Sequence, residues 1–213
     1  MNGITISCDG IDGCGKSTAI ATLERVLTEM GLPGKTVITR EPGGTPLAEN
    51  MRAILKDGHP DEDLTDTAEL LLFFAARSQT YEHIIKPAVD NGDVVLMDRS
   101  NLTTEAYQGG GRGISSEVID NLKQMVVGEF EPDLIIYLDV PVEIGLQRSR
   151  GRGALDRIEQ SGVKFYQRAR QRFLQLAETR ENIVWLDASK PIDEVQANIE
   201  RIVRHWFGVA TVR

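Results

Sequence analysis

The stretch Gly10-Ile11-Asp12-Gly13-Cys14-Gly15-Lys16-Ser17-Thr18 decides the fold, because it fits the phosphate-binding pattern G-x-x-x-x-G-K-[ST]. Residues 3–8 before it are rich in β-branched side chains and predict a strand, and the residues after Lys16 repeat apolar side chains at helical spacing. In this context the glycines let backbone N–H groups converge on one anion beside the positive end of a helix, which a chance glycine-rich turn would not provide. The pattern predicts a nucleoside triphosphate site in which Lys16 reaches the β- and γ-phosphates and Ser17 holds Mg²⁺.

The composition is that of an ordinary globular chain. Its 213 residues, 41% hydrophobic and 26% charged, suit one α/β domain and argue against disorder. We see no apolar run as long as a membrane span and no signal peptide, and we expect Cys8 and Cys14 to be free thiols, so the expected location is the cytoplasm, away from membranes. A net charge of −8 argues against nucleic acid as a partner, but leaves a small anionic substrate to local arginines.

Alternating strands and helices predict the architecture. Apolar runs at 36–39, 94–97, 134–138 and 183–186 are short and nearly continuous, as in parallel strands that helices cover on both faces. Helical patterns lie roughly at 45–56, 65–89, 102–108, 115–127, 141–149, 161–180 and 191–206. We therefore expect a single domain over 1–213, a three-layer α/β/α fold with a five-stranded parallel sheet, and a site beyond the C-terminal ends of the strands.

Two pairs of residues suit nucleotide binding: one pair directly follows the strand at 94–97, and the other lies on the helix that precedes this strand. Asp98 closes the strand as a Mg²⁺-shell carboxylate would, and Arg99 can grip a phosphate bidentately, although a surface ion pair is the alternative. Phe73 and Arg77 are four residues apart, so a ring could lie against a base and a guanidinium could read its edge, unless Phe73 is simply core.

The helix after Arg99 carries a hydroxyl, an aromatic ring and an amide at spacings of three and four residues. Thr104, Tyr107 and Gln108 are expected to face one way, which suits a polar, planar ligand. A helix cap and core packing are the alternative explanation for the same three residues.

Four arginines crowd into a glycine-containing segment of this acidic chain: Arg148, Arg150, Arg152 and Arg157. A solvated charged face and a nucleic-acid patch are the alternatives to a lid, over about 147–160, that brings cations onto a transferring phosphoryl group. Because positions 11–14 contain no arginine, we expect the catalytic cations to come from this lid. A separate hypothesis concerns Cys14, whose thiolate we expect to be favoured beside Lys16 and a helix N-terminus.

Several longer motifs together resemble those of the bacterial thymidylate kinases, and the match runs nearly end to end. They are Arg40-Glu41-Pro42-Gly43-Gly44-Thr45, Leu72-Phe73-Phe74-Ala75-Ala76-Arg77, Asp98-Arg99 with Ala106-Tyr107-Gln108-Gly109-Gly110-Gly111-Arg112-Gly113, and Leu155-Asp156-Arg157-Ile158-Glu159. The resemblance implies the P-loop nucleoside monophosphate kinase fold, phosphorylation of dTMP to dTDP by ATP with Mg²⁺, and a homodimer.

The resemblance also implies roles for single residues. Phe73 would stack on thymine, Arg77 would hydrogen-bond its edge, and Thr104 and Gln108 would complete the base pocket. Tyr107 would crowd the 2′ position of the sugar and disfavour ribonucleotides. The remaining assignments are Glu41 to the dTMP site, Arg52 and Arg99 to the acceptor phosphate, Asp12 to the 3′-hydroxyl or a magnesium-bound water, Ser17 and Asp98 to the metal, and Lys16, Asp12, Arg99, Arg148 and Arg152 to catalysis.

Three other functions compete with this one. A kinase for another nucleoside monophosphate or a deoxynucleoside would reuse the scaffold with a different base pocket. A GTP-binding switch would need an Asn-Lys-x-Asp guanine motif, and the sequence contains none. A nucleic-acid-dependent ATPase would use the lid arginines on a phosphate backbone, with steep salt dependence.

Overall fold

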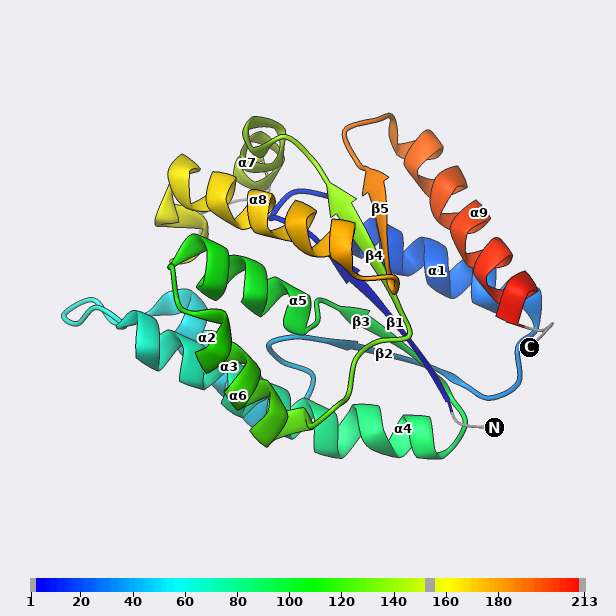
Figure 1. Cartoon of the computed structure of the whole chain (residues 1–213), viewed down its shortest axis with the longest axis horizontal. Coiled ribbons are helices and arrows are strands. Elements are labelled where there is room, and N and C mark those ends of the chain that lie inside the picture. The colour runs from blue at the N-terminus through cyan, green and yellow to red at the C-terminus, as the bar shows by residue number, and fades with distance from the viewer. Residues whose placement is uncertain (1–2, 152–155, 211–213) are drawn as a thin grey trace.

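A parallel sheet of five strands lies at the centre of the structure, in the order β2-β3-β1-β4-β5 (Figure 1). The computed structural model describes residues 3–151 and 156–210. The strands are β1 Ile4–Asp9, β2 Thr36–Arg40, β3 Val94–Asp98, β4 Leu134–Asp139 and β5 Ile183–Asp187, and every adjacent pair is parallel. β4 is buried along its whole length, as its continuous apolar run Leu134–Leu138 requires. The expected α/β architecture is confirmed.

Helices connect the strands. They are α1 Lys16–Met30, α2 Pro46–Asp57, α3 Asp66–Thr80, α4 Lys86–Asp90, α5 Asn101–Thr104, α6 Ser116–Val127, α7 Val142–Arg150, α8 Val163–Thr179 and α9 Ile192–Ala210. α2 begins where the sequence chemistry directs, since the Thr45 hydroxyl accepts a hydrogen bond from the Ala48 N–H and Pro46 opens the first turn. A short 3₁₀ helix, η3, covers Glu159–Ser161.

Two helical patterns of the sequence contain π-helical turns that the pattern did not predict. The segment expected as one helix over 65–89 is α3, then η1 Tyr81–Ile85, then α4, so the wider turn lies just before Pro87, which cannot donate a backbone hydrogen bond. The helix expected over 102–108 is α5 followed by η2 Glu105–Gly111. Its wider turn changes which side chains share a face, with consequences for the site.

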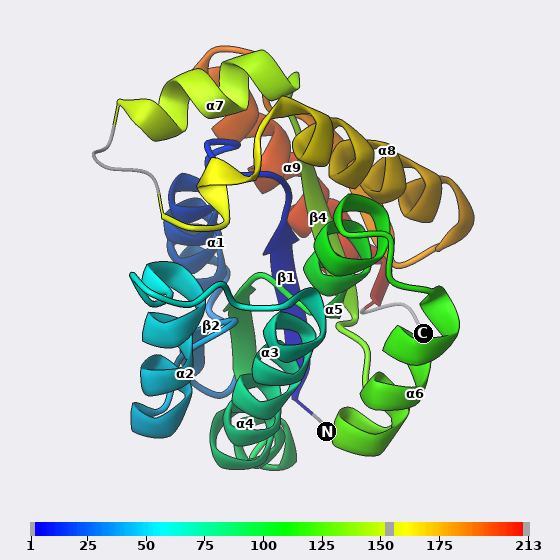
Figure 2. The same ribbon diagram turned by 90° about the vertical axis from the view of Figure 1, so that its left-hand side faces the viewer.

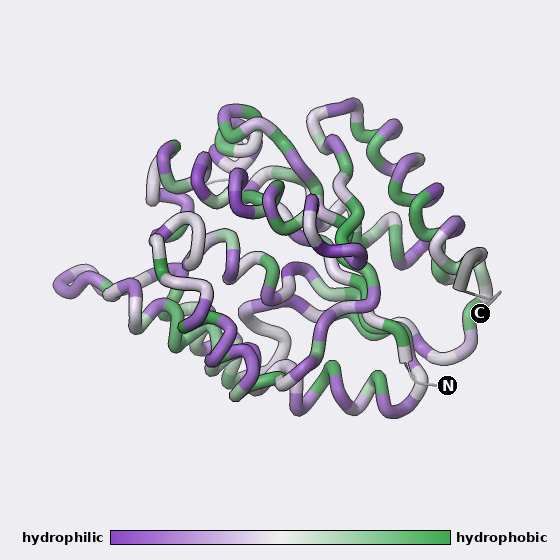
Figure 3. The backbone as a smooth tube through the Cα atoms, in the orientation of Figure 1, coloured by the Kyte–Doolittle hydropathy of each residue, from purple (hydrophilic) through white to green (hydrophobic). Residues whose placement is uncertain are grey.

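The core fills both faces of the sheet. α1 and α9 pack together on one face, while α4, α5 and α8 lie on the other (Figure 1). Leu23 of α1 and Val203 of α9 are fully buried, and on the opposite face the ring of Phe173 stacks on Tyr137 with centroids 4.9 Å apart. The inner strands are largely hydrophobic, whereas the outer helices alternate hydrophobic and hydrophilic residues (Figure 3). No helix among residues 3–151 and 156–210 is both long and apolar enough to span a membrane.

The fold brings four chain segments to one edge of the sheet. The loop after β1, the loop after β2, the start of α5 after β3 and the segment around α7 all lie beyond the C-terminal ends of the strands (Figure 2). α2 and α3 close this edge from the side of β2. Parallel sheets bind ligands at this edge, so the fold places the site here.

Candidate active site

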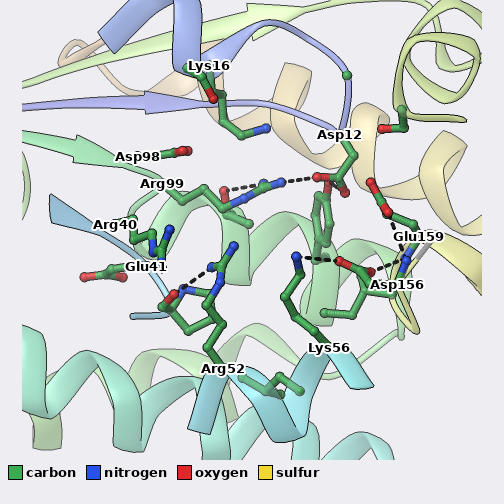
Figure 4. A pocket seen from close by; sticks show the side chains of 18 of the residues that line it. Asp12, Lys16, Arg40, Glu41, Arg52, Lys56, Asp98, Arg99, Asp156 and Glu159 are labelled. Carbon is green, nitrogen blue, oxygen red and sulfur yellow. Dashed lines mark hydrogen bonds and ion pairs between the residues drawn. The ribbon is translucent and has the colours of Figure 1, made fainter. Parts of the chain in front are cut away.

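A cavity of about 680 Å³ occupies the C-terminal edge of the sheet. Its walls come from the P-loop, the loop after β2, α2, α3, the residues after β3, η2, α7 and residues 156–159. Lys16 lies on one side, Arg52 and Lys56 lie on the other, and Arg99 lies between them (Figure 4). Such an elongated set of cations suits two anions that meet end to end.

The P-loop packs closely against α7 because glycine occupies a position at which a side chain would clash. Gly13 has a φ of 76°, and a Cβ there would lie 2.0 Å from the Gly145 carbonyl oxygen of α7. Gly15 caps the N-terminus of α1 with a φ of 100°. The Lys16 ammonium bends over the loop and donates to the carbonyl oxygens of Gly10 at 3.2 Å and Ile11 at 3.1 Å. The predicted P-loop therefore has its lysine on the cavity side of the loop.

Arg99 joins the P-loop to the end of β3. Its Nη2 donates to Asp12 Oδ1 at 2.5 Å, and its Nη1 donates to the Gly10 carbonyl oxygen at 3.0 Å. The guanidinium also lies 5.2 Å from the ring centroid of Tyr107. Arg99 has a φ of 77°, a left-handed conformation that is uncommon for a side-chain-bearing residue and that gathers at functional sites. The backbone strain thus aims this side chain across the cavity.

Asp12 is held as an anion. Burial alone would raise the pKa of Asp12, but Arg99 and Lys16, together with hydrogen bonds from the hydroxyls of Tyr166 and Tyr107, hold that pKa well below its usual range. Both tyrosines donate to Oδ2 at 2.9 Å. A carboxylate that stays ionised at neutral pH accepts hydrogen bonds and balances cations, so Asp12 is suited to orientation and not to proton transfer.

Tyr166 is a site residue that the sequence did not reveal. It lies on α8, and its hydroxyl reaches Asp12 although 154 residues separate them in the chain. Its position falls in the same buried stripe as Phe165 and Phe173, and its ring packs edge-on against Tyr107 at 5.9 Å. No sequence signal distinguishes this tyrosine from its core neighbours, because only its hydroxyl is polar and the partner comes from the far end of the chain.

The side of the cavity opposite the P-loop is built from the loop after β2 and from α2. Arg52 Nη1 donates to the Pro42 carbonyl oxygen at 2.7 Å, and burial lowers the pKa of Arg52. Arg40, to which we assigned no role from sequence, lines the cavity and pairs with Glu49. Phe73 also lines this side. The structure thus brings together three residues that were expected to bind dTMP, namely Arg52, Glu41 and Phe73.

Three of the residues expected in the base pocket lie behind the residues that line the cavity. Arg77, Thr104 and Gln108 do not line the cavity, and all three are buried. The expectation that Thr104 and Gln108 share a face with Tyr107 is wrong: the Thr104 hydroxyl accepts from Arg77 at 2.9 Å, and the Gln108 amide donates to Glu69 at 2.9 Å, whereas Tyr107 reaches Asp12. The π-helical turn of η2 causes this, because its i→i+5 pattern does not keep the α-helical face.

The arginines of the expected lid segment do not all line the cavity. Arg148 lines the cavity and donates to the Ala188 carbonyl oxygen at 3.0 Å. Arg157 does not line it. Its guanidinium instead donates to Glu69 at 2.5 Å and to the Leu55 carbonyl oxygen at 3.0 Å, so Arg157 is not among the cations that line the cavity. The expected catalytic residue Arg152 lies outside the described residues.

Ser17 and Asp98 line the cavity and suit a divalent cation. Asp98 Oδ1 is buried without a hydrogen-bond partner, a costly state that a cation or its water would relieve. Among the residues that the structure describes, no group of three or more His, Cys, Asp and Glu side chains forms a metal site. An ion held by one carboxylate, one hydroxyl and nucleotide phosphates is the arrangement that Mg²⁺ favours.

Cys14 is not activated, and the expectation of a favoured thiolate is wrong. The side chain is 2% exposed, and burial raises the pKa of the Cys14 thiol even though Lys16 and Arg99 lower it. Its backbone N–H donates to the Ile11 carbonyl oxygen at 3.3 Å, and Cys14 does not line the cavity. The loop turns this side chain into the core instead of toward a ligand. Cys8 is also buried and both thiols are free, as expected.

We predict that Cys14 resists alkylation in the folded protein. Incubation with iodoacetamide at pH 7.5, followed by mass spectrometry of peptides, should label Cys14 at least about a hundredfold more slowly than in urea-unfolded protein, because the thiolate is scarce and inaccessible. The Cys14→Ser variant identifies the labelled peptide. Rapid native labelling that ATP suppresses would contradict the buried state and restore the thiolate hypothesis.

Comparison with known proteins identifies the family. The sequence profile described as thymidylate kinase matches residues 8–199. A thymidylate kinase of Photobacterium profundum is 49% identical over 202 residues, which cover 95% of this chain and 96% of that protein. The crystal structure of thymidylate kinase from Ehrlichia chaffeensis matches with a TM-score of 0.75 and 29% identity, over 96% of this chain and 100% of that one. The resemblance seen in the motifs is confirmed, and the chain belongs to the thymidylate kinase family.

Proposed function

We propose that this protein transfers the γ-phosphoryl group of ATP to dTMP and releases dTDP, with Mg²⁺ as the metal. The observation that carries the proposal is the position of Arg99, which spans the cavity between the P-loop and the side that holds Arg52. ATP would bind with its phosphates on the P-loop, and dTMP would bind with its phosphate toward Arg52 and Arg99. The family supports the choice of both substrates.

Electrostatics is the main barrier in such a reaction. The acceptor phosphate has a second pKa near 6, so it is mostly dianionic and needs no strong base. Two unit charges about 4 Å apart repel by roughly 4 kcal/mol at an effective dielectric of 20, and each nucleotide tail carries several charges. Lys16, Arg52, Arg99 and Arg148 surround the path between the tails, where fixed cations lower the barrier.

The metal and the lid complete the proposed donor site. Ser17 and Asp98 would hold the Mg²⁺, and the bound ion supplies neutralising charge on the β- and γ-phosphates. We propose that the segment over about 147–160, which contains Arg152, is the lid. Arg148 and Glu159, near the two ends of this segment, line the cavity. Covering the phosphates would exclude water, which otherwise competes with dTMP as the acceptor.

The proposed base pocket uses the residues that lie at and behind the wall. Phe73 would stack on thymine, and the buried Arg77 would reach its edge together with Thr104. Gln108 Oε1 is buried without a hydrogen-bond partner, which supports a role as an acceptor within this pocket. Tyr107, fixed by its bond to Asp12, would crowd the 2′ position, and Asp12 would accept from the 3′-hydroxyl.

A panel of acceptors tests the proposed function. Purified protein with ATP and MgCl₂, followed by coupled detection of ADP, should show activity with dTMP that exceeds activity with dCMP, dGMP, dAMP and UMP by at least about a hundredfold in kcat/KM. Removal of Mg²⁺ with EDTA should abolish turnover. Stimulation by DNA in place of dTMP, or equal rates across the panel, would contradict the proposal.

Replacing Arg99 by Ala should lower kcat/KM for dTMP by about a hundredfold or more, on the order of the 2.7–4 kcal/mol of a lost electrostatic stabiliser. Steady-state assays of Arg99→Ala and Arg99→Lys, with circular dichroism to confirm folding, measure the effect. Lysine keeps the charge but not the bidentate geometry, so it should recover only part of the loss. A loss of less than about threefold in Arg99→Ala would show that the guanidinium is not in the reaction path.

We also propose a cytoplasmic homodimer, as the resemblance implies. Five exposed apolar side chains support the dimer, and they lie on the neighbouring helices α2, α3 and α6: Leu47, Ile54, Leu71, Val118 and Met125. Residues seven apart on one helix share a face, which aligns Leu47 with Ile54 and Val118 with Met125. A face of this kind on a monomer would be an aggregation liability.

Light scattering after gel filtration should give twice the chain mass of 23.6 kDa for the wild type. The Leu71→Asp/Met125→Glu variant should elute with the mass of one chain, because buried unpaired carboxylates oppose association. Ile192→Ser, at an apolar residue of α9 that is 59% exposed, is the matched control and should remain dimeric. A single-chain mass for the wild type would contradict the dimer.

A further inference from the structure

A continuous chain of polar contacts leads from Arg180, at the end of α8, to Glu41 in the cavity wall. Arg180 donates to both carboxylate oxygens of Glu105, at 2.9 and 2.6 Å. Glu105 Oε1 accepts from Asn101 Nδ2 at 3.0 Å, and Asn101 Oδ1 accepts from Arg77 Nη1 at 3.2 Å. Arg77 Nε then donates to Glu41 Oε2 at 2.6 Å. Five side chains from four parts of the chain therefore act as one network.

This network is internal and not a set of surface ion pairs. Asn101 and Glu105 are 6% and 5% exposed, and Arg77 is 4% exposed. Only the Arg180 side chain reaches solvent appreciably, at 31% exposure. Buried charged and amide groups are costly unless hydrogen-bonded, so each link depends on the next one. Neither Asn101 nor Glu105 lines the cavity, and the sequence motifs did not single them out.

Glu105 determines which atom Asn101 presents to Arg77. An ionised carboxylate only accepts hydrogen bonds, whereas an amide has one accepting and one donating end. With Glu105 on one side, the Asn101 NH₂ group must face Glu105, and its oxygen must face the Arg77 guanidinium. Arg77 only donates and requires the same orientation from the other side, so the Glu105 carboxylate reinforces it by accepting from the Asn101 NH₂ group.

Arg77 is held from every other direction as well. Its Nη2 donates to Thr104 Oγ1 at 2.9 Å and to the Ser100 carbonyl oxygen at 3.5 Å, and its guanidinium lies 4.9 Å from the ring centroid of Phe74. Of the five N–H donors of an arginine, one Nη1 hydrogen has no partner among the described residues. The planar group is thus fixed in one orientation with one donor to spare.

We propose that Asn101 and Glu105, anchored by Arg180, are positioning residues for recognition of the base. They hold the Arg77 guanidinium, and the Glu41 carboxylate paired with it, in the orientation that accepts thymine. Thymine presents the O4 acceptor where cytosine presents an N4 donor, so a fixed donor favours thymine. This inference rests on the proposed function, in which Arg77 reads the base edge.

Exchanging the amide and the carboxylate groups between positions 101 and 105 tests the proposal. In Glu105→Gln only one oxygen remains to accept from both Arg180 and Asn101, so one of these contacts is lost. In Asn101→Asp a second carboxylate faces Glu105. We expect each single variant to raise KM for dTMP about tenfold and to narrow the preference for dTMP over dCMP. In the double variant Asn101→Asp/Glu105→Gln, the introduced amide donates to the introduced carboxylate, which now faces Arg77. KM for dTMP should therefore return to within about threefold of the wild type.

Several readouts separate positioning from general destabilisation. KM for ATP should stay within about twofold of the wild type in every variant, because the network does not contact the P-loop. Arg180→Gln changes the most exposed link, so the fold should tolerate it, and it should raise KM for dTMP by about threefold. Glu200→Gln is the matched control, since Glu200 also accepts from two arginines, Arg25 and Arg204, but on the far helices α1 and α9. It should leave both KM values unchanged.

Defined outcomes would overturn the proposal. Additive losses in the double variant, or equal increases in KM for ATP and dTMP that follow the drop in thermal unfolding temperature, would show that the network only stabilises the fold. Unchanged KM and base preference in all variants would show that Arg77 needs no such support. A wild-type protein that does not phosphorylate dTMP would instead refute the proposed function, and this is measured first.

Discussion

The site depends on the ion pair between Arg99 and Asp12. The two side chains are 14% and 18% exposed, so their charges are largely removed from water and each needs the other. Loss of one partner of a buried pair leaves an uncompensated charge, a destabilisation of about 3–5 kcal/mol. This pair also fixes the P-loop relative to β3, because Arg99 bonds to Gly10 as well. The proposed donor phosphate site on the P-loop and the proposed acceptor phosphate site at Arg99 therefore both depend on this ion pair.

Departures from regular structure gather around that pair. Arg99 adopts a left-handed backbone, and the π-helical turn η2 follows a few residues later. In η2, Tyr107 faces Asp12, whereas Gln108 faces Glu69 and Thr104, just before η2, faces Arg77. Irregular turns of this kind are frequent at functional sites, because they direct neighbouring side chains to different places.

The electrostatics of the cavity differs from that of the whole chain. The protein has a net charge of −8, yet Lys and Arg side chains line the cavity on both sides of Arg99: Lys16, Arg40, Arg52, Lys56 and Arg148. Carboxylates hold several of these cations in place, because Asp12 pairs with Arg99, Glu49 with Arg40 and Asp156 with Lys56. Local charge, and not the total, decides which ligand such a cavity accepts.

Local sequence patterns are enough to predict the parallel sheet, the P-loop and the edge of the sheet at which the cavity lies. These follow from local patterns: continuous apolar runs for buried strands, and glycines with Lys16 between a strand and a helix. Tertiary structure alone decided that Tyr166 reaches Asp12, that Arg157 turns to Glu69 and that Cys14 is buried. Each of these depends on contacts between distant segments, and side-chain burial and pKa are properties of the packed fold, which no local pattern contains.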